Sequence, residues 1–92
     1  MANIECNDGF SMSVVAGNGI NYSWPRKGPG PFAEGEVGYP SRFEPLIVPY
    51  QDGPGEPTMS VYAYVPTNVL IKVIQKHGGL KSGTLPPLVH QE

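Results

Sequence analysis

Apolar and polar residues alternate near the beginning of the chain. One side of an extended backbone would carry Phe10, Met12, Val14 and Ala16. This period of two predicts a half-buried strand over 10–16. A short apolar stretch, 4–6, lies upstream, and the connection 7–9 ends in Gly, which adopts positive φ easily and so predicts a β-hairpin. A second turn at 17–19 predicts a third strand over 20–23.

Prolines and glycines interrupt the pattern in two long stretches. The segment 24–32 contains three prolines and the segment 40–58 contains five. Because proline fixes φ and lacks an N–H donor, we expect loops there rather than helices or central strands. The apolar triplet 46–48 is expected to pin the second loop to the core. Between the loops, 33–39 is predicted to be an edge or bulged strand, because glycines interrupt it.

The pattern becomes helical after residue 65. The stretch 59–65 is rich in β-branched and aromatic residues and predicts a strand near the centre of the sheet. Beyond it, one helical stripe consists of Val69, Leu70, Val73 and Ile74. Pro66 suits the first helical position, and the glycines at 78–79 are typical of a helix end. The sequence therefore predicts one helix of about eleven residues.

These elements predict an α+β fold. We expect an antiparallel sheet of about four strands, with one C-terminal helix packed on it and long Pro/Gly-rich loops. A chain of 92 residues fits a single domain, which we place at 1–80. Residues 81–92 lack periodicity and are predicted to form an extended, partly mobile tail.

The charge balance excludes several classes of protein. Six basic and eight acidic residues give a net charge of −2, which lacks the positive field of an autonomous DNA-binding domain. No apolar run approaches the roughly 18 residues needed to cross a bilayer. The first residues do not resemble a secretory signal. We therefore expect a cytoplasmic protein that acts away from membranes.

Few side chains could support catalysis or hold a metal. His77, at the predicted helix end, is interpreted as a cap, and neither His77 nor His90 has further ligands at metal-binding spacing. The single cysteine, Cys6, excludes an intrachain disulfide and is expected to be a small buried residue. Glu34 and Glu36 share one strand face and are expected to be solvated. We predict no catalytic residue, no metal and no cofactor.

Aromatic and basic residues in the loops favour a binding role. Such residues are enriched at interaction hot spots, and proline reduces the entropy lost on docking. Two lysines one helical turn apart add a basic face that could contact an acidic or phosphate surface. The predicted partner-binding residues are Trp24, Arg26, Lys27, Arg42, Phe43, Tyr50, Lys72 and Lys76.

Two parts of the chain resemble small accessory proteins of phages and prophages. They are the segment 4–14 (Ile-Glu-Cys-Asn-Asp-Gly-Phe-Ser-Met-Ser-Val) and the strand 61–66 with the helix that ends at 77–79 (His-Gly-Gly). That group includes anti-CRISPR proteins. The resemblance implies a compact inhibitor that docks on a host protein or ribonucleoprotein of bacterial defence and blocks target nucleic-acid access. It implies no particular site residue.

Two other functions fit the same residues. A structural or assembly protein of a virion would use Pro-rich arms and edge strands to pair subunits. A small enzyme would pair Cys6 with a histidine as a nucleophilic dyad. We expect the assembly protein to oligomerise, and we expect the enzyme to be inactivated by thiol alkylation.

Overall fold

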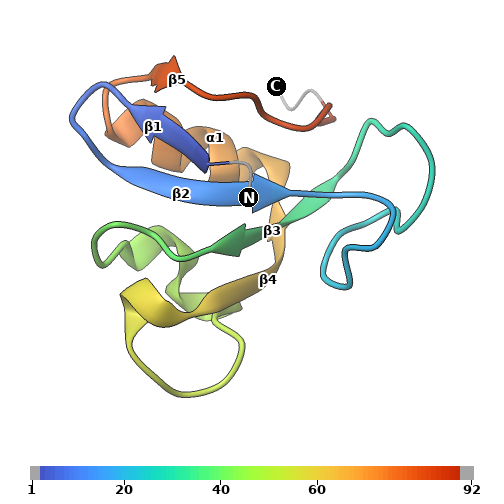
Figure 1. The fold of residues 1–92 in the computed structure, drawn as a ribbon, viewed down its shortest axis with the longest axis horizontal. Coiled ribbons are helices and arrows are strands. Elements are labelled where there is room, and N and C mark those ends of the chain that lie inside the picture. Colours follow the sequence, from blue (N-terminus) through green and yellow to red (C-terminus); the bar gives the residue numbers. More distant parts are fainter. Residues whose placement is uncertain (1–2, 90–92) are drawn as a thin grey trace.

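The chain folds into a sheet covered on one face by a single α-helix (Figure 1). A computed structural model describes residues 3–89, and within them five strands form one antiparallel sheet of order β4-β3-β2-β1-β5. The elements are β1 (Asn3–Cys6), β2 (Ser11–Val15), β3 (Glu34–Gly38), β4 (Val61–Pro66), α1 (Thr67–Lys76) and β5 (Leu80–Ser82). The predicted α+β class is confirmed, and β5 beside β1 brings the sheet to five strands.

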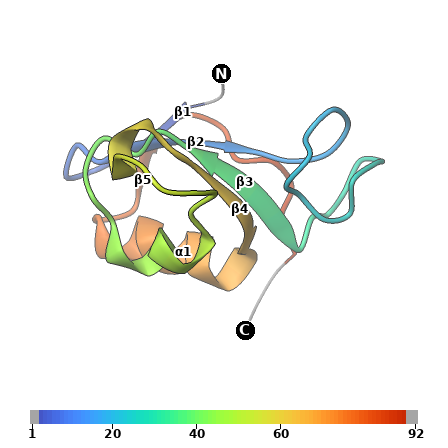
Figure 2. The same ribbon diagram turned by 90° about the horizontal axis from the view of Figure 1, so that it is seen from below.

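The hydrophobic core lies between the sheet and the helix layer. Figure 2 shows the sheet edge-on, with α1 beneath it and the 3-10 helix η1 (Pro45–Tyr50) beside α1. Alternate strand residues point to this layer, as the cross-strand pairs Ile4 with Met12 and Val14 with Val37 illustrate. Each fully buried side chain of this kind contributes about 1.5 to 3 kcal/mol. The predicted apolar face of β2 and the predicted helical stripe are both confirmed, although Ser13 on the other face of β2 is buried as well.

Strand β3 lies inside the sheet, between β2 and β4, so the edge position predicted for 33–39 is wrong, whereas the alternative, a bulged strand, agrees with the register shift between Gly35 and Val37. The reason is close packing at Gly35. A Cβ atom there would lie 3.3 Å from the carbonyl oxygen of Val15 and 3.7 Å from Leu70 Cδ1. The glycine therefore marks the close approach of the helix layer rather than an exposed edge.

Strand β4 forms one end of the sheet, which corrects its predicted place near the centre. Its outer edge is covered by the preceding loop. Gln51 forms a bridge with Tyr62, and the Asp52 N–H donates to the Val61 carbonyl over 2.9 Å. A loop rather than another strand therefore satisfies this edge.

A β-bulge interrupts the pairing of β3 with β4. The register shifts between Gly35 and Val37 of β3, and Tyr64 adopts φ 53°. As a result Tyr62 and Val65 are both buried, although a regular strand would place them on opposite faces.

The segment 20–23 is a turn, so the predicted third strand is wrong. Its polar groups serve neighbouring loops and strands. The Tyr22 carbonyl accepts from the Tyr64 N–H at 3.0 Å, and the buried Ser23 hydroxyl accepts from the Gly17 N–H at 3.0 Å. The segment therefore covers β4 instead of extending the sheet as a strand.

The proline-rich stretch 40–58 contains more regular structure than expected. It includes η1 and, at its end, the 3-10 helix η2 (Pro57–Met59). Both begin with a proline, whose missing N–H costs nothing at that position. Ile47 is fully buried, which confirms that the apolar triplet pins this loop to the core.

The helix and the C-terminal segment complete the fold. Helix α1 begins at Thr67 rather than at Pro66, which ends β4 and caps the helix. Beyond β5, the Phe32 N–H donates to the Pro87 carbonyl and the Val89 N–H to the Phe32 carbonyl, both at 2.8 Å. The last residues of the predicted tail, His90 included, lie outside the described residues. Among residues 3–89, no helix has the length and apolar character needed to span a membrane.

Candidate functional site

A buried group of charged side chains centres on His77, the C-cap residue of α1. Its Nδ1 lies 2.6 Å from Asp8 Oδ2, and its Nε2 lies 2.7 Å from Glu44 Oε1. Asp8 belongs to the β1–β2 turn, and Glu44 immediately precedes η1. The ring therefore joins three segments that are distant in the sequence.

Glu44 is an unusual buried carboxylate, because its side chain is 0% exposed. Burial acts to raise its pKa, but hydrogen bonds from the Leu46 N–H, from His77 and from Lys76 Nζ outweigh burial and lower the pKa. The Leu46 N–H lies 2.9 Å and the lysine nitrogen 3.0 Å from Oε2. Glu44 is therefore ionised at neutral pH, with both oxygens bonded.

Asp8 is the more accessible of the two carboxylates. Its pKa is lowered first by a hydrogen bond from the Phe10 N–H and then by one from His77, against partial desolvation, with added help from the charges of His77 and Arg42. Arg42 Nη2 lies 3.2 Å from Oδ2, the oxygen that also contacts His77. One carboxylate oxygen thus holds both cations.

Both ring nitrogens of His77 contact a carboxylate. A neutral imidazole has one donor and one acceptor nitrogen, whereas both nitrogens here face ionised carboxylates. A doubly protonated ring therefore donates one hydrogen bond to each carboxylate. It also stacks on Phe10, with ring centroids 4.1 Å apart and planes 10° from parallel. In the doubly protonated form no lone pair remains for general-base catalysis, and the ring joins the three segments.

The two lowered carboxylate pKa values predict loss of stability in acid. The ordinary pKa values are 4.5 for Glu44 and 3.8 for Asp8, and both are lower in the folded chain. Their stabilising effect is thus complete above about pH 5 and is lost as the pH falls through the folded values. Thermal unfolding between pH 7 and pH 3 should show Tm falling below pH 5. We expect the Tm of Glu44→Gln to fall less over this pH range. An equal fall in that variant would contradict the lowered pKa assigned to Glu44.

Three predicted partner-binding residues lie around the buried Glu44, and Lys72 is one helical turn from one of them, Lys76. Phe43 precedes it and is 59% exposed, and Leu46 follows it and is exposed. Lys76 forms the ion pair with Glu44, while Arg42 pairs with Asp8. We call Arg42, Phe43, Leu46, Lys72 and Lys76 the Phe43 surface.

The other predicted residues lie elsewhere. Trp24, Arg26 and Lys27 belong to the loop 16–33, at the opposite end of the sheet from the turn 7–9 (Figure 1). Trp24 is 57% exposed, and Arg26 Nη2 donates to the Tyr64 hydroxyl at 3.1 Å. Tyr50 is half-buried and packs against the core. Seven of the eight residues therefore form two separate groups, Tyr50 belongs to neither, and there is no single continuous surface.

Cys6 and the two strand glutamates also have defined places. Cys6 is fully buried as expected, and burial, followed by the charges of Asp8 and Glu5, raises the pKa of its thiol. Glu34 and Glu36 are half-buried rather than fully solvated. Burial, with a smaller effect of Asp52, raises the pKa of Glu36. A raised thiol pKa is the opposite of what a nucleophilic cysteine requires.

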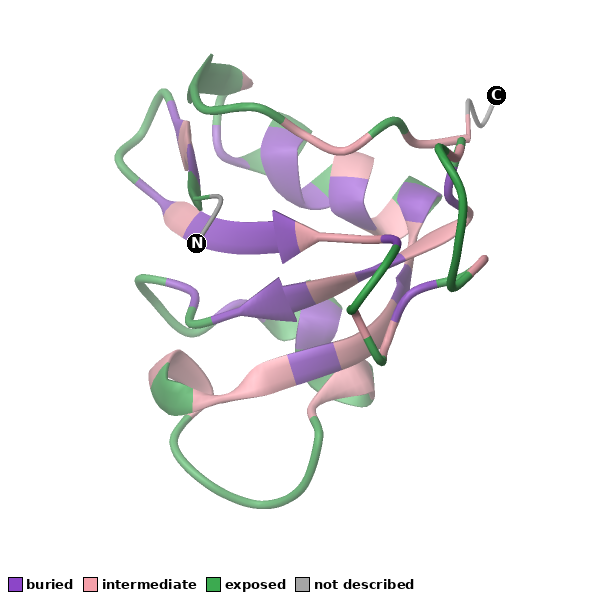
Figure 3. Cartoon of the chain, turned by 45° about the vertical axis from the view of Figure 1, so that its right-hand side comes forward, coloured by how far each residue is buried: buried purple, intermediate pink, exposed green. Residues whose placement is uncertain are grey.

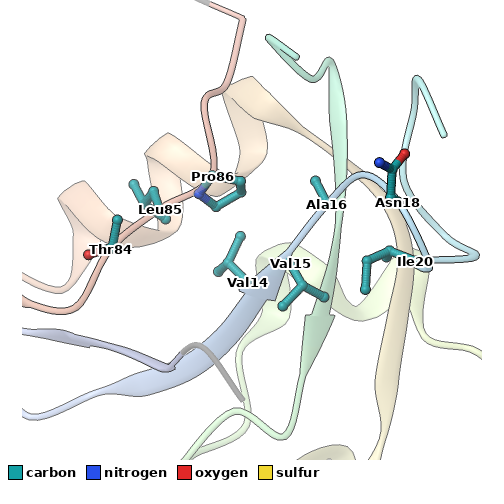
Figure 4. Close-up of a pocket in the computed structure, with 8 residues that line it drawn as sticks. All are labelled: Val14, Val15, Ala16, Asn18, Ile20, Thr84, Leu85 and Pro86. Atoms are coloured by element: carbon teal, nitrogen blue, oxygen red, sulfur yellow. The ribbon is translucent and has the colours of Figure 1, made fainter. Parts of the chain in front are cut away.

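A shallow pocket of about 390 Å³ lies between the end of β2, the turn after it and the C-terminal segment (Figure 4). It is lined by Val14, Val15, Ala16, Asn18, Ile20, Thr84, Leu85 and Pro86. None of these side chains is titratable, so the pocket offers apolar contact and two polar groups but no acid–base chemistry. None of the predicted partner-binding residues lines it.

Comparisons with protein-family models, with curated proteins and with solved structures find no match. Within residues 3–89, no three His, Cys, Asp or Glu side chains are grouped so that they could hold a metal ion. The site is therefore interpreted from its own geometry.

Asp8, Phe10 and Glu44 are the members of the cluster that sequence reasoning missed as site residues. Asp8 is separated from His77 by 69 positions and Glu44 by 33, so no local spacing indicates the contacts. In the sequence, one feature indicates a buried carboxylate at this place, namely the position of Glu44 between Phe43 and the apolar η1 segment. A carboxylate in such a setting is either exposed or paired with a cation.

Proposed function

We propose that this chain is a non-enzymatic binding protein that docks through the Phe43 surface on a bacterial defence complex and blocks the access of target nucleic acid. The observation that carries the proposal is the exposed Phe43 ring beside the buried, fully bonded Glu44. Large aromatic side chains that fill a partner's pocket are frequent hot spots. The resemblance to phage accessory proteins favours the class of partner.

The segment that carries Phe43 is ordered before any partner binds. The Ser41 N–H donates to the Ser11 carbonyl at 2.8 Å, and the Ser41 hydroxyl accepts from the Ser11 N–H at 2.9 Å. Glu44 anchors the other side of Phe43. Because both neighbours are held, the ring is presented with little entropy left to lose on docking.

The charges around Phe43 favour an acidic protein partner. Arg42, Lys72 and Lys76 are all exposed. Lys76 keeps 46% of its side chain accessible while it pairs with Glu44, so it can contact a second carboxylate without leaving the first. Cations around an apolar anchor speed association and fix orientation. We therefore infer that the partner presents an apolar recess with carboxylates at its edge.

The same groups support a role without catalysis. Both ring nitrogens of His77 are bonded to carboxylates, and the pKa of the Cys6 thiol is raised by burial. Neither side chain is prepared for nucleophilic or general-base work. Docking needs only the exposed residues that the Phe43 surface supplies.

The proposal is tested by titrating the chain into guide-loaded CRISPR effector complexes, one purified representative of each type, and measuring target-DNA binding by fluorescence anisotropy. One equivalent of the chain should abolish DNA binding by at least one effector. Phe43→Asp should weaken inhibition about 30-fold, the effect of losing a 2 kcal/mol hot spot. Trp24→Asp is the matched control, because Trp24 is similarly exposed but lies in the other group.

Three results would contradict the proposal. Unchanged DNA binding with every effector would exclude this class of partner. Equal potency of Phe43→Asp and the unmodified chain would exclude the Phe43 surface. Light scattering that shows concentration-independent multimers would favour the assembly protein, since an inhibitor does not need to oligomerise.

A further inference from the structure

Arg42 is held on the Phe43 surface by one carboxylate oxygen and by the face of the Phe10 ring, whose centroid lies 6.0 Å from Arg42 Cζ. Arg42 Nη2 and His77 Nδ1 lie 3.2 Å and 2.6 Å from the same atom, Asp8 Oδ2. The other oxygen, Oδ1, accepts from the Phe10 N–H at 2.9 Å. The Phe10 N–H therefore fixes one oxygen of the carboxylate, and the Nδ1 proton of His77 fixes the oxygen that anchors Arg42.

We propose that the Nδ1 proton of His77 positions Arg42 by holding Asp8 Oδ2, so that a docking partner responds to the protonation state of this nearly buried histidine. His77 is thus a positioning residue of the Phe43 surface. Its effect on Arg42 is independent of the proposed function, whereas its effect on a partner rests on that function. The backbone of the turn does not take part in the change. The Asp8 N–H donates to the His77 carbonyl at 3.1 Å whatever the charge of the ring.

The two carboxylates differ in what they lose when His77 becomes neutral. Glu44 has no exposed side-chain surface, whereas Asp8 is 40% exposed. Leaving a buried carboxylate oxygen without its donor costs more than returning a half-exposed one to water. The remaining proton should therefore stay on Nε2, toward Glu44. A lone pair on Nδ1 would then face Oδ2 and repel it, together with the guanidinium that it holds.

Charged groups from each neighbouring segment take part. The β1–β2 turn supplies Asp8, the segment before η1 supplies Arg42 and Glu44, and α1 supplies Lys76. Phe10, which immediately precedes β2, presents only its uncharged ring face to His77. The thiol of Cys6 on β1 is also titratable. Burial raises the pKa of this thiol, and the charge of Asp8 adds to the effect. When His77 loses its proton, Asp8 keeps Arg42 as its cationic partner and Glu44 keeps Lys76. Arg42 is the more weakly held of the two cations.

The test follows the free chain by NMR while the pH is raised. Ring nitrogen shifts of His77 report which nitrogen keeps the proton, and the Arg42 Nε–Hε signal reports the guanidinium. We expect the neutral ring to be the Nε2–H form, and the Arg42 signal to move with the same midpoint as His77. A neutral ring protonated on Nδ1, or an Arg42 signal that ignores the titration, would overturn the positioning role.

Asp8→Asn separates positioning from a general effect of pH. Its amide oxygen can still accept from the Phe10 N–H, and its NH₂ group can donate to a neutral Nδ1 but cannot hold Arg42. This variant at low pH should resemble the unmodified chain after deprotonation. Asp52→Asn is the matched control, because Asp52 accepts a hydrogen bond from the Tyr22 hydroxyl and is absent from the contacts of the cluster.

Binding to the guide-loaded effector complex identified by the titration gives the second readout. Affinity should fall about tenfold as His77 loses its proton, which corresponds to one charge-assisted hydrogen bond. Asp8→Asn should show the weaker affinity at every pH. Flat affinity in the unmodified chain would overturn the effect on the partner. If no effector binds, the proposed function fails, whereas the NMR titration still decides whether His77 positions Arg42.

Discussion

Glu44→Ala is expected to lower the free energy of unfolding by about 3 kcal/mol, the lower end of the range for removing one member of a buried ion pair. The change removes the acceptor for His77, Lys76 and the Leu46 N–H together. The loss stays near the lower end because Lys76, with 46% of its side chain exposed, can turn into water. Urea denaturation at pH 7 measures the difference.

Glu56→Ala is the matched control for this prediction. Glu56 is also a glutamate before a 3-10 helix, but it is exposed and makes no side-chain cap hydrogen bond. Its removal should change the unfolding free energy by less than about 0.5 kcal/mol. Equal effects of the two substitutions would show that the buried cluster does not stabilise the fold.

Gly83→Ala is expected to cost about 1 to 3 kcal/mol from backbone strain alone, and more from collision with β1. Gly83 has φ +94°, and an added Cβ would lie 2.8 Å from Ile4 Cα and still closer to the Asn3 carbonyl oxygen. Backbone atoms cannot turn aside, so β1 or β5 must shift. Chemical denaturation should therefore show a markedly lower midpoint.

Gly53→Ala isolates the contribution of strain. Gly53 has φ +79°, but its Cβ would meet nothing within 4 Å. We expect a loss of about 1 kcal/mol there. If Gly83→Ala costs no more than Gly53→Ala, the C-terminal segment does not pack on β1 as described.

The parts of the fold that the sequence predicted are those with local causes. The period of two in β2 and the helical stripe of α1 each arise within a few residues, and both segments bury the predicted faces (Figure 3). The hairpin at 7–9 follows from turn chemistry in the same way. Local patterns were sufficient because one face of each element is buried against the other.

The errors arose where neighbours distant in the sequence decide the outcome. Gly35 favoured an edge position for β3, but this glycine lies in the interior of the sheet, where a Cβ atom would approach the Val15 carbonyl oxygen to 3.3 Å. The β-rich 59–65 segment was placed near the centre, yet its outer edge is satisfied by Gln51 and Asp52. Propensity describes the residue itself and contains no information about which segment covers it.

The candidate site was predicted in part for the same reason. Exposed types such as Phe43 and Trp24 can be recognised from loop composition, and both are exposed. Their division into two groups depends on the path of the chain. The His77 cluster depends on two carboxylates brought from distant turns, which no single-sequence spacing encodes.

Hydrogen exchange of the free and the effector-bound chain tests docking through the Phe43 surface most directly. Binding is predicted to slow exchange of the amides in 41–48 and in the last two turns of α1, and to leave the 16–33 loop unchanged. Slower exchange confined to 16–33, with 41–48 unaffected, would contradict the account and assign docking to the Trp24 group.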